Sequence, residues 1–257
     1  MMETNEQEAV HNNVLGTNCV AEACGQFGVE RMVLISSDKA ADPSSIMGAT
    51  KWFCEEVLQA LALLWPRTCY VTVRFGNVLG SRGSVVPTFH QQILRGGPVT
   101  VTHPEMTRYF MTIREAVRLV LQAGAVGKSR ELYLLDMGDP VRIVDLANDM
   151  IRLCGFEPGV DIDIAFTGMR PGEKLHERLA AEREKIEPTP WNGLSIIRRP
   201  DYYSCSELQD ALDRLEKGVS HGSAADLRRL LGELVSPRRQ APTLPEAEMR
   251  AAHKLPT

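Results

Sequence analysis

Short apolar strands alternate with longer amphipathic helices along most of the chain. The runs Arg31 to Ser36 (RMVLIS) and Cys69 to Phe75 (CYVTVRF) predict strands. The first run is apolar at nearly every position, so we expect both of its faces to be buried. Helices are expected from about Glu6 to Phe27 and from about Ser45 to Leu64, where apolar residues recur at helical spacing and Pro66 follows. This alternation is typical of an α/β domain.

The same alternation continues after a loop rich in glycine and serine, GNVLGSRGSVVP. Thr112 and Glu115 are spaced as a capping box, which predicts that a helix begins there. The other predicted elements are a helix from Pro87 to about Arg95, a strand at Glu131 to Leu135, a helix at Ile143 to Cys154, and a half-exposed strand at Asp161 to Phe166. From about Pro237 the chain is rich in Pro, Arg, Ala and Glu, which predicts a mobile tail.

Composition and charge exclude several classes of function. The chain has 257 residues, is 44% hydrophobic and 24% charged, and carries a net charge of -4. An acidic balance gives no electrostatic reason to expect nucleic acid as a partner. No run of 18 apolar residues and no signal peptide is visible, so we expect a cytoplasmic protein. The six cysteines form no CxxC motif and no zinc-site spacing with histidine, so no metal is expected.

A glycine-rich turn of the kind that opens a dinucleotide-binding fold is absent from the sequence. Such folds start with a strand, a GxGxxG-like turn and a helix whose N-terminus holds the pyrophosphate. Gly76, Gly80 and Gly83 follow a late strand and lead to Pro87, so they do not match this pattern. We therefore expect a partial Rossmann-like, doubly wound parallel sheet without its glycine-loop half, and an unpaired edge in that sheet.

Polar residues that could carry chemistry follow the first predicted strand. Ser37, Asp38 and Lys39 come directly after it, and ligands in doubly wound folds bind beyond the carboxyl ends of strands. Met47 and Lys51 are four residues apart on the next helix and so share one face. A strand-end hydroxyl, an acid and a helical lysine match the layout of a short-chain dehydrogenase site, in which Tyr usually stands where Met47 stands.

Three segments make the chain resemble a known family. They are VLISSDKAADPSSIMGATK, VRFGNVLGSRGSVVPTFHQQILRGGPVTVTHPEMTRYFMTIREAVRLV, and GMRPGEKLHERL. Together they resemble the polysaccharide-biosynthesis nucleotide-sugar 4,6-dehydratases of the extended short-chain dehydrogenase class, over roughly Glu8 to Arg199. In having methionine at position 47, the chain resembles the membrane-anchored branch of this family. Full-length relatives of that branch are anchored through an N-terminal region that we expect to be absent here.

The resemblance implies a reaction and a role for each residue. The family removes water from UDP-N-acetylglucosamine or a related UDP-sugar, and NAD takes a hydride from carbon 4 and returns it to carbon 6. Asp38 would be the acid for the leaving hydroxyl, Lys39 the base at carbon 5, and Ser37 a hydrogen-bond partner at carbon 4. Ser36, Lys51 and Arg74 would contact the cofactor. Met47 cannot accept the proton of the 4-hydroxyl, so Asp38 or a water relayed through Lys51 remains open for that step.

Substrate binding is implied by the same resemblance. Arg108 and Arg170 match the two diphosphate arginines of the family. Arginine suits this role because its guanidinium group can bind two phosphate oxygens at once. Glu173 would accept hydrogen bonds from the ribose. Asn77, Ser84 and Val85 would lie in the loop that covers the sugar nucleotide. We interpret Arg183, Arg198 and Arg199 as surface residues in ion pairs, and His103 and His176 as structural.

The expected domains follow from these assignments. Residues 1–80 and about 108–150 would form the second half of the NAD-binding domain. Residues 81–107 and 151–217 would form a smaller substrate subdomain, and 218–257 a helix and the mobile tail. Two other functions remain open, a nucleotide-sugar epimerase and an inactive fragment that binds a sugar nucleotide. A homodimer or a separate chain that carries the N-terminal portion is a possible partner.

Overall fold

The computed structural model describes residues 2–81 and 83–235. A five-stranded sheet with the order β1-β2-β7-β11-β10 forms the centre of the larger lobe. Its strands are β1 (Arg31–Ile35), β2 (Cys69–Arg74), β7 (Glu131–Leu135), β10 (Lys185–Pro188) and β11 (Leu194–Arg198). The first three are parallel, and β11 and β10 extend the sheet in antiparallel fashion. This is the mixed α/β fold, with a Rossmann-like parallel core, that the sequence predicts.

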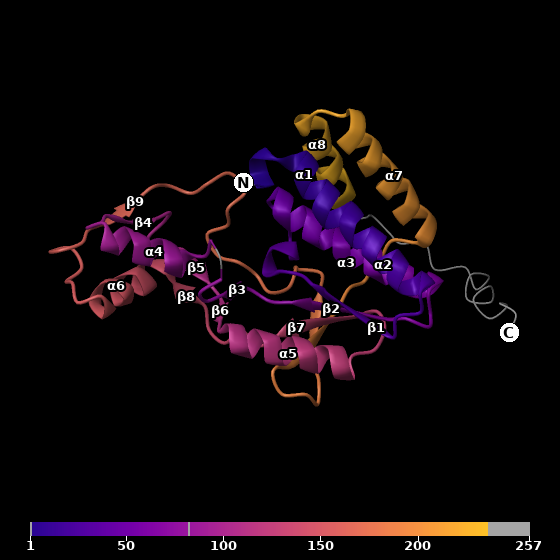
Figure 1. The fold of residues 1–257 in the computed structure, drawn as a ribbon, viewed down its shortest axis with the longest axis horizontal. Coiled ribbons are helices and arrows are strands. Elements are labelled where there is room, and N and C mark those ends of the chain that lie inside the picture. Colours follow the sequence, from indigo (N-terminus) through magenta and orange to yellow (C-terminus); the bar gives the residue numbers. More distant parts are fainter. Residues whose placement is uncertain (1, 82, 236–257) are drawn as a thin grey trace, which may run out of the picture.

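Helices cover both faces of this sheet (Figure 1). Helix α5 (Ile113–Val126) packs against β1, β2 and β7 on one face. Helix α3 (Ile46–Leu64) packs on the other face, beside a continuous helical segment made of α1 (Glu6–Ala9), the π-helix η2 (Val10–Leu15) and α2 (Gly16–Gln26). The predicted capping box starts α5, with both hydrogen bonds between Thr112 and Glu115 present.

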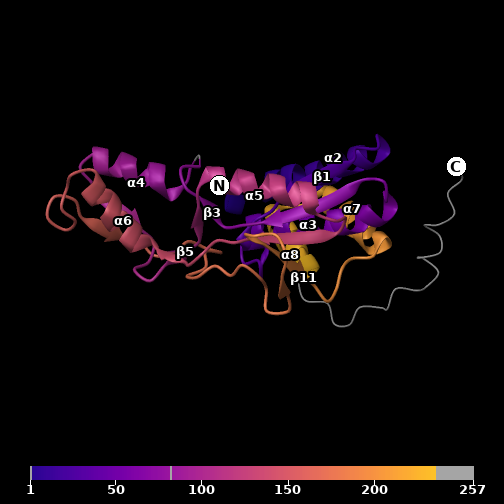
Figure 2. The same ribbon diagram turned by 90° about the horizontal axis from the view of Figure 1, so that it is seen from below.

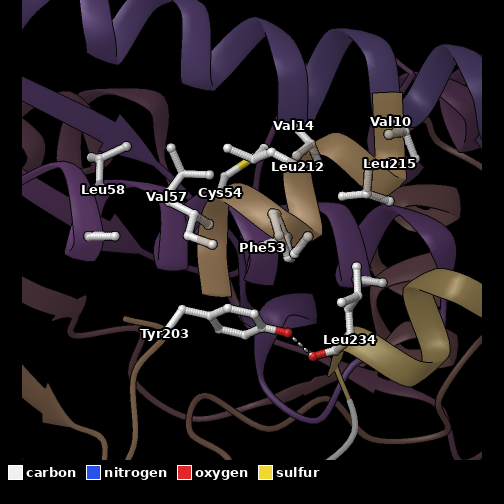
Figure 3. Packing of buried hydrophobic residues seen from close by; sticks show 14 of the residues in the cluster. Val10, Val14, Phe53, Cys54, Val57, Leu58, Tyr203, Leu212, Leu215 and Leu234 are labelled. Carbon is white, nitrogen blue, oxygen red and sulfur yellow. Dashed lines mark hydrogen bonds between the residues drawn. The ribbon is translucent and has the colours of Figure 1, made fainter. Parts of the chain in front are cut away.

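Two C-terminal helices form a further layer over α3 (Figure 1). They are α7 (Cys205–His221) and α8 (Ala224–Val235), and both contact α3 and the N-terminal helical segment. Phe53 of α3 lies at the centre of the shared core, and its ring meets Tyr203 edge-on at 5.7 Å between centroids (Figure 3). The Tyr203 hydroxyl donates a hydrogen bond to the Leu234 carbonyl at 2.9 Å, which ties α8 to this core.

The smaller lobe lies at one end of the elongated molecule (Figure 2). Its helices α4 (Val85–Leu94) and α6 (Ile143–Leu153) pack over the parallel pair β4 (Val99–Val101) and β9 (Ile164–Phe166). Short strand pairs join the lobes. They are β3 (Asn77–Val78) with β6 (Phe110–Met111), and β5 (Thr107–Arg108) with β8 (Val141–Arg142). Two short 3-10 helices, η1 (Met2–Thr4) and η3 (Asp38–Ala40), complete the elements.

Several predicted boundaries differ from this arrangement. The sequence placed residues 151–217 in the substrate subdomain, but β10, β11 and α7 belong to the larger lobe because they complete its sheet and core. Helix α6, assigned to the larger lobe, packs in the smaller one. The strand expected from Asp161 begins only at Ile164. Strand β1 is not buried on both faces, because it is the edge strand and Ile35 is 49% exposed.

Two further observations bear on the sequence-based expectations. Strand β1 pairs only with β2 among the described residues, so it is an edge strand of this sheet there. No helix in the described part of the chain is both long and apolar enough to cross a bilayer. The mobile tail predicted from about Pro237 lies outside the described residues.

Candidate active site

The predicted acid and base lie together just beyond β1. Backbone pairing with the neighbouring strand continues past the end of β1, because Ser36 N–H donates to the Val73 carbonyl at 2.7 Å and Asp38 N–H to the Phe75 carbonyl at 2.9 Å. The chain then turns into η3. Lys39 Nζ donates to Asp38 Oδ1 at 2.9 Å, so the two groups form a direct ion pair.

Ser37 fixes the geometry of this turn. Its hydroxyl donates to Asp38 Oδ1 at 3.0 Å and accepts the backbone N–H of Lys39 at 3.3 Å. A serine at the start of a helical turn favours this arrangement, because its side chain satisfies an amide that has no partner within the turn. Ser37, Asp38 and Lys39 therefore act as one rigid unit rather than as three independent polar residues.

The Asp38 carboxylate is fully buried, and only one of its oxygens is satisfied. Its Oδ2 atom has no hydrogen-bond partner among the described residues. The backbone of Gly76 lies against this oxygen so closely that a Cβ atom there would approach it to 3.1 Å. Buried carboxylate oxygens without a partner are rare because desolvation is costly. An orphan oxygen at this position fits a group that exchanges a proton with a bound molecule.

Two residues from other parts of the chain complete the surroundings of Lys39. Asn77 in β3 accepts from Lys39 Nζ through Oδ1 at 3.3 Å. Glu177, in the loop after β9, places Oε1 at 3.7 Å from the same nitrogen. The Lys39 side chain is 27% exposed, so it borders solvent while Asp38 and Glu177 lie beneath it. The cluster thus joins β1, β3 and the 167–184 loop.

The predicted diphosphate residues come from β5 and from the same loop. Arg108 is nearly buried, donates to the backbone carbonyls of Thr107 and Leu175, and lies 3.6 Å from Glu173 Oε1. Arg170 is exposed, and its backbone N–H donates to Glu173 Oε2 at 3.0 Å. Because Glu173 and Glu177 are four residues apart, one loop connects Arg108 to the Asp38–Lys39 pair.

The remaining predicted residues lie around this centre. Met47 and Lys51 are half-buried on α3, and Lys51 Nζ donates to the Ile35 carbonyl at the end of β1 at 3.0 Å. Ser84 caps α4 through its backbone only, and its buried hydroxyl oxygen has no partner within the described residues. Val85 begins that helix. The roles predicted for these residues stay predictions.

The structure does not support the predicted contact of Ser36 and Arg74 with a cofactor. Arg74 is completely buried and its guanidinium donates to Glu55, Glu184 and the Leu179 carbonyl. The Ser36 hydroxyl donates to Glu55 as well. The polar groups of Ser36 and Arg74 are therefore directed into the protein interior, where they hold the carboxyl ends of β1 and β2 in place.

Arg199 was interpreted as a surface residue, which is wrong. Its side chain is 5% exposed and pairs with Glu55, Glu56 and Glu184. Burial lowers the pKa of Arg199, but the three carboxylates raise it by more. Burial raises the pKa of Glu184, but the guanidinium groups of Arg74 and Arg199 lower it by more, so that the pKa is about 2. Two guanidinium groups and three carboxylates thus form one buried network, which spacing along the sequence could not reveal.

Two residues that sequence analysis missed approach the acid–base pair. Glu177 lies inside the GMRPGEKLHERL segment, but nothing in that segment distinguishes it from its exposed neighbours. Lys174 Nζ donates to the Ala41 carbonyl at 2.7 Å, just beyond η3. Burial lowers the pKa of Lys174, while Glu177, Asp42 and Asp38 oppose this effect. Only the folded chain brings this loop against η3.

One cavity of the described structure lies apart from this cluster. It has a volume of about 720 Å³ and lies between α3, α8 and the segments around Glu184 and Arg199. Trp52 and Tyr203 contribute aromatic surface to it. None of the predicted catalytic or substrate-binding residues lines it. We place the candidate site at the Asp38–Lys39 pair, because two buried carboxylate oxygens without a partner, on Asp38 and Glu177, lie there.

Comparisons with known proteins agree with the family resemblance of the sequence. A family model described as "Polysaccharide biosynthesis protein" matches residues 1–199. The capsular polysaccharide biosynthesis protein CapD of Staphylococcus aureus is 59% identical over 220 residues, which are 86% of this chain and 36% of CapD. The probable polysaccharide biosynthesis protein EpsC of Bacillus subtilis is 58% identical over 184 residues, 72% of this chain and 30% of EpsC. The chain therefore spans about a third of the length of these relatives.

Several solved structures share this fold, and some of them are described as enzymes that act on nucleotide sugars. Pen from Bacillus thuringiensis superposes with a TM-score of 0.71 at 32% identity, over 83% of this chain and 71% of Pen. A dTDP-glucose 4,6-dehydratase from Streptomyces venezuelae with NAD bound shares the fold at a TM-score of 0.58 and 20% identity, over 64% of this chain and 56% of the enzyme. More distant sequence relatives include UDP-glucose 4-epimerases from Rickettsia species, 34–35% identical over 69–72% of this chain. With these matches, the chain belongs to the polysaccharide biosynthesis protein family.

Proposed function

We propose that this chain supplies the acid–base and substrate-binding part of a nucleotide-sugar 4,6-dehydratase that acts on UDP-N-acetylglucosamine or a related UDP-sugar. The observation that carries this proposal is the Asp38–Lys39 ion pair, with a buried orphan oxygen on Asp38. Removal of water across carbons 5 and 6 of a 4-keto sugar needs a base and an acid on adjacent atoms of the substrate. The side chains of two consecutive residues meet this need.

The pair would act in the following way. In its neutral amine form Lys39 takes the proton from carbon 5, which the neighbouring ketone makes acidic. Asp38, in its protonated form, gives a proton to the hydroxyl that leaves carbon 6. Each proton transfer contributes roughly 10²- to 10⁴-fold to the rate. The elimination leaves Lys39 charged and Asp38 ionised, which is the ion pair present in this structure.

Substrate binding is proposed for the groups on and around the 167–184 loop. Arg108 lies next to Glu173, so a diphosphate bound at its guanidinium would have a carboxylate nearby for the ribose hydroxyls. Exposed Arg170 is free to approach the same diphosphate from the other end of the turn. Asn77 and Ser84 offer polar groups near the sugar, and the orphan hydroxyl of Ser84 supports this role. Val85 would supply apolar contact beside it.

NAD is the proposed cofactor, since related structures hold it and since a 4-keto intermediate requires a hydride acceptor. The residues present fit part of this cofactor. Lys51 is half-buried at the carboxyl end of β1, where its ammonium could donate to a ribose hydroxyl in place of the Ile35 carbonyl. The described residues contain no glycine-rich turn for the pyrophosphate. Ser36 and Arg74 would support this site from below without touching the cofactor.

One experiment tests the proposal. The purified chain is incubated with UDP-N-acetylglucosamine and NAD, and the nucleotide sugars are separated and analysed by mass spectrometry. The proposal expects a 4-keto-6-deoxy product lighter by one water, lost in Lys39→Ala and kept in Lys128→Ala, which changes an exposed lysine far from the site. Calorimetry measures sugar-nucleotide binding in parallel.

Other outcomes identify the competing functions. A UDP-glucose 4-epimerase relationship at 35% identity favours epimerisation as the second candidate. A sugar of altered configuration and unchanged mass would establish it and refute dehydration. Binding without turnover and without NAD would instead establish a binding fragment or one part of a larger assembly. A homodimer and a separate partner chain remain predictions, which the mass of the purified protein in solution tests.

A further inference from the structure

Glu177 is the one carboxylate outside the Asp38–Lys39 pair that lies against Lys39 in the described structure. Its side chain is 4% exposed, and Oε1 is 3.7 Å from Lys39 Nζ. Its other oxygen, Oε2, is buried and has no hydrogen-bond partner within residues 2–81 and 83–235. A buried carboxylate kept half-unsatisfied beside a lysine is costly, and such groups gather where protonation states are controlled.

The charges around Lys39 come from several elements. Asp38 contributes a carboxylate from η3, Asn77 a neutral carbonyl oxygen from β3, and Glu177 a second carboxylate from the 167–184 loop. Lys174 on the same loop interacts with Asp38, Asp42 and Glu177. Asp42 is paired at 3.8 Å with exposed Arg178. Lys39 therefore faces two carboxylates directly, and Lys174 supplies the compensating positive charge nearby.

We propose that Glu177 is a positioning residue that sets the pH at which Lys39 gives up its proton, and so the pH range in which the pair is reactive. This inference rests on the proposed dehydratase function. Before elimination, a proton must pass from Lys39 Nζ to Asp38 Oδ1 over the existing 2.9 Å hydrogen bond. The N–H bond breaks, the O–H bond forms, and both groups reach their reactive states together.

The sign of the effect follows from electrostatics. A negative charge at 3.7 Å favours the ammonium form of Lys39, so Glu177 opposes the transfer to Asp38 and raises the pH at which Lys39 loses its proton to solvent. Lys174 favours the neutral form and acts in the opposite direction. The ion pair also restricts the flexible Lys39 side chain and keeps it close to Asp38. Loss of the Glu177 charge should therefore lower the pH at which Lys39 becomes nucleophilic.

The test reads Lys39 directly and does not need turnover. The purified chain is treated with acetic anhydride at a series of pH values, and the rate of Lys39 acetylation is measured by peptide mass spectrometry. In Glu177→Gln the pH of half-maximal reactivity is expected to fall by about one unit, at the lower end of the effect of a charge within roughly 4–6 Å. Glu177→Asp, which keeps the charge, is expected to stay near the wild-type value.

Controls separate this effect from disturbed folding. Glu182→Gln removes one charge from an exposed position of the same loop and should leave the Lys39 curve unchanged. Lys174→Met should move the curve to higher pH, opposite to Glu177→Gln, and it provides the test if Glu177→Gln does not fold. An unchanged curve in a folded Glu177→Gln protein, or a shift of Lys174→Met to lower pH, would overturn the inference.

Turnover gives an independent second readout. If the chain dehydrates UDP-sugar, the acidic limb of kcat/KM is expected to move to lower pH in Glu177→Gln by the same amount as the acetylation curve. A purely structural role would lower the rate without moving this limb. If no dehydration occurs, the proposed function fails while the acetylation curves still decide the role of Glu177.

Discussion

Replacement of Glu184 by Gln is expected to remove a pH-dependent part of the stability of the larger lobe. Glu184 accepts from Arg74 at 2.7 Å and from Arg199 at 2.7 Å, and its side chain is 5% exposed. Burial raises the pKa of Glu184, and the two guanidinium groups more than offset this, so its pKa in the folded chain is about 2 instead of 4.5. Glutamine keeps the shape of the side chain and removes the charge.

The magnitude follows from this difference of pKa. A folded-state value of about 2 against 4.5 in the unfolded chain stabilises the ionised protein by about 3 kcal/mol, at roughly 1.4 kcal/mol per pH unit. Because the pKa is lowered on folding, this stability is fully present above pH 4.5. It is lost as the pH falls from 4.5 toward 2. Between pH 7 and pH 3.5 the loss amounts to about 1.5 kcal/mol.

Urea unfolding of both proteins at pH 7, 5, 4 and 3.5 measures the effect. We expect the wild-type chain to exceed Glu184→Gln by about 3 kcal/mol at pH 7, and this difference to shrink at the acidic end. Buried Glu56 has a raised pKa and the opposite pH dependence, and it is present in both proteins.

Glu182→Gln is the matched control, since it makes the same change at an exposed position two residues away. Its effect should stay within about 0.5 kcal/mol at every pH. A difference between wild type and Glu184→Gln that is small at pH 7, or that does not change down to pH 3.5, would refute the assigned role of the buried network.

Three further predictions concern the core, a helix cap and a thiol. Phe53→Ala should lower the free energy of unfolding by about 3–5 kcal/mol, because the ring is completely buried between α3, α7 and α8; a loss below 1 kcal/mol in urea unfolding would contradict this packing. Thr112→Ala should cost about 1 kcal/mol through loss of the α5 capping box, whereas Thr112→Ser should cost little in the same assay. Burial raises the pKa of the Cys54 thiol to about 11, so iodoacetamide at pH 8 should label exposed Cys19 in the folded chain and leave Cys54 unlabelled until urea is added. Labelling of both cysteines at equal rates would show that Cys54 is accessible.

Local signals in the sequence predicted most of the individual elements. Strand β7 was predicted with the bounds it has, and α3 to within one residue, because a serine cap and a proline enclose its apolar pattern. The capping box at Thr112 depends on two residues three positions apart, and such a short motif can be recognised directly in the sequence. Asp38 and Lys39 were also singled out, since they follow a strand that local composition identifies, and the structure pairs their side chains.

Contacts between distant parts of the chain were not predictable in this way. Arg74 and Glu184 are 110 residues apart, and nothing in their local surroundings indicates that they meet in the interior. Arg199 follows an exposed strand end, which favours a surface interpretation. The antiparallel addition of β11 to β7 reverses the strand direction expected from the parallel core. Glu177 is placed against Lys39 only because the loop folds back over η3.

The two ends of the described chain depend on each other. Gln7 donates to the Gly222 carbonyl across 215 positions of sequence, and Glu6 pairs with Arg228. The helical segment 6–26 therefore has to wait until α7 and α8 are synthesised before its apolar side is covered. During synthesis that side would be open to chaperones for most of the elongation time. A ribosome-bound chain stopped before Ser204 should be cleaved by protease within residues 6–26, while one extended past Val235 outside the exit tunnel should resist.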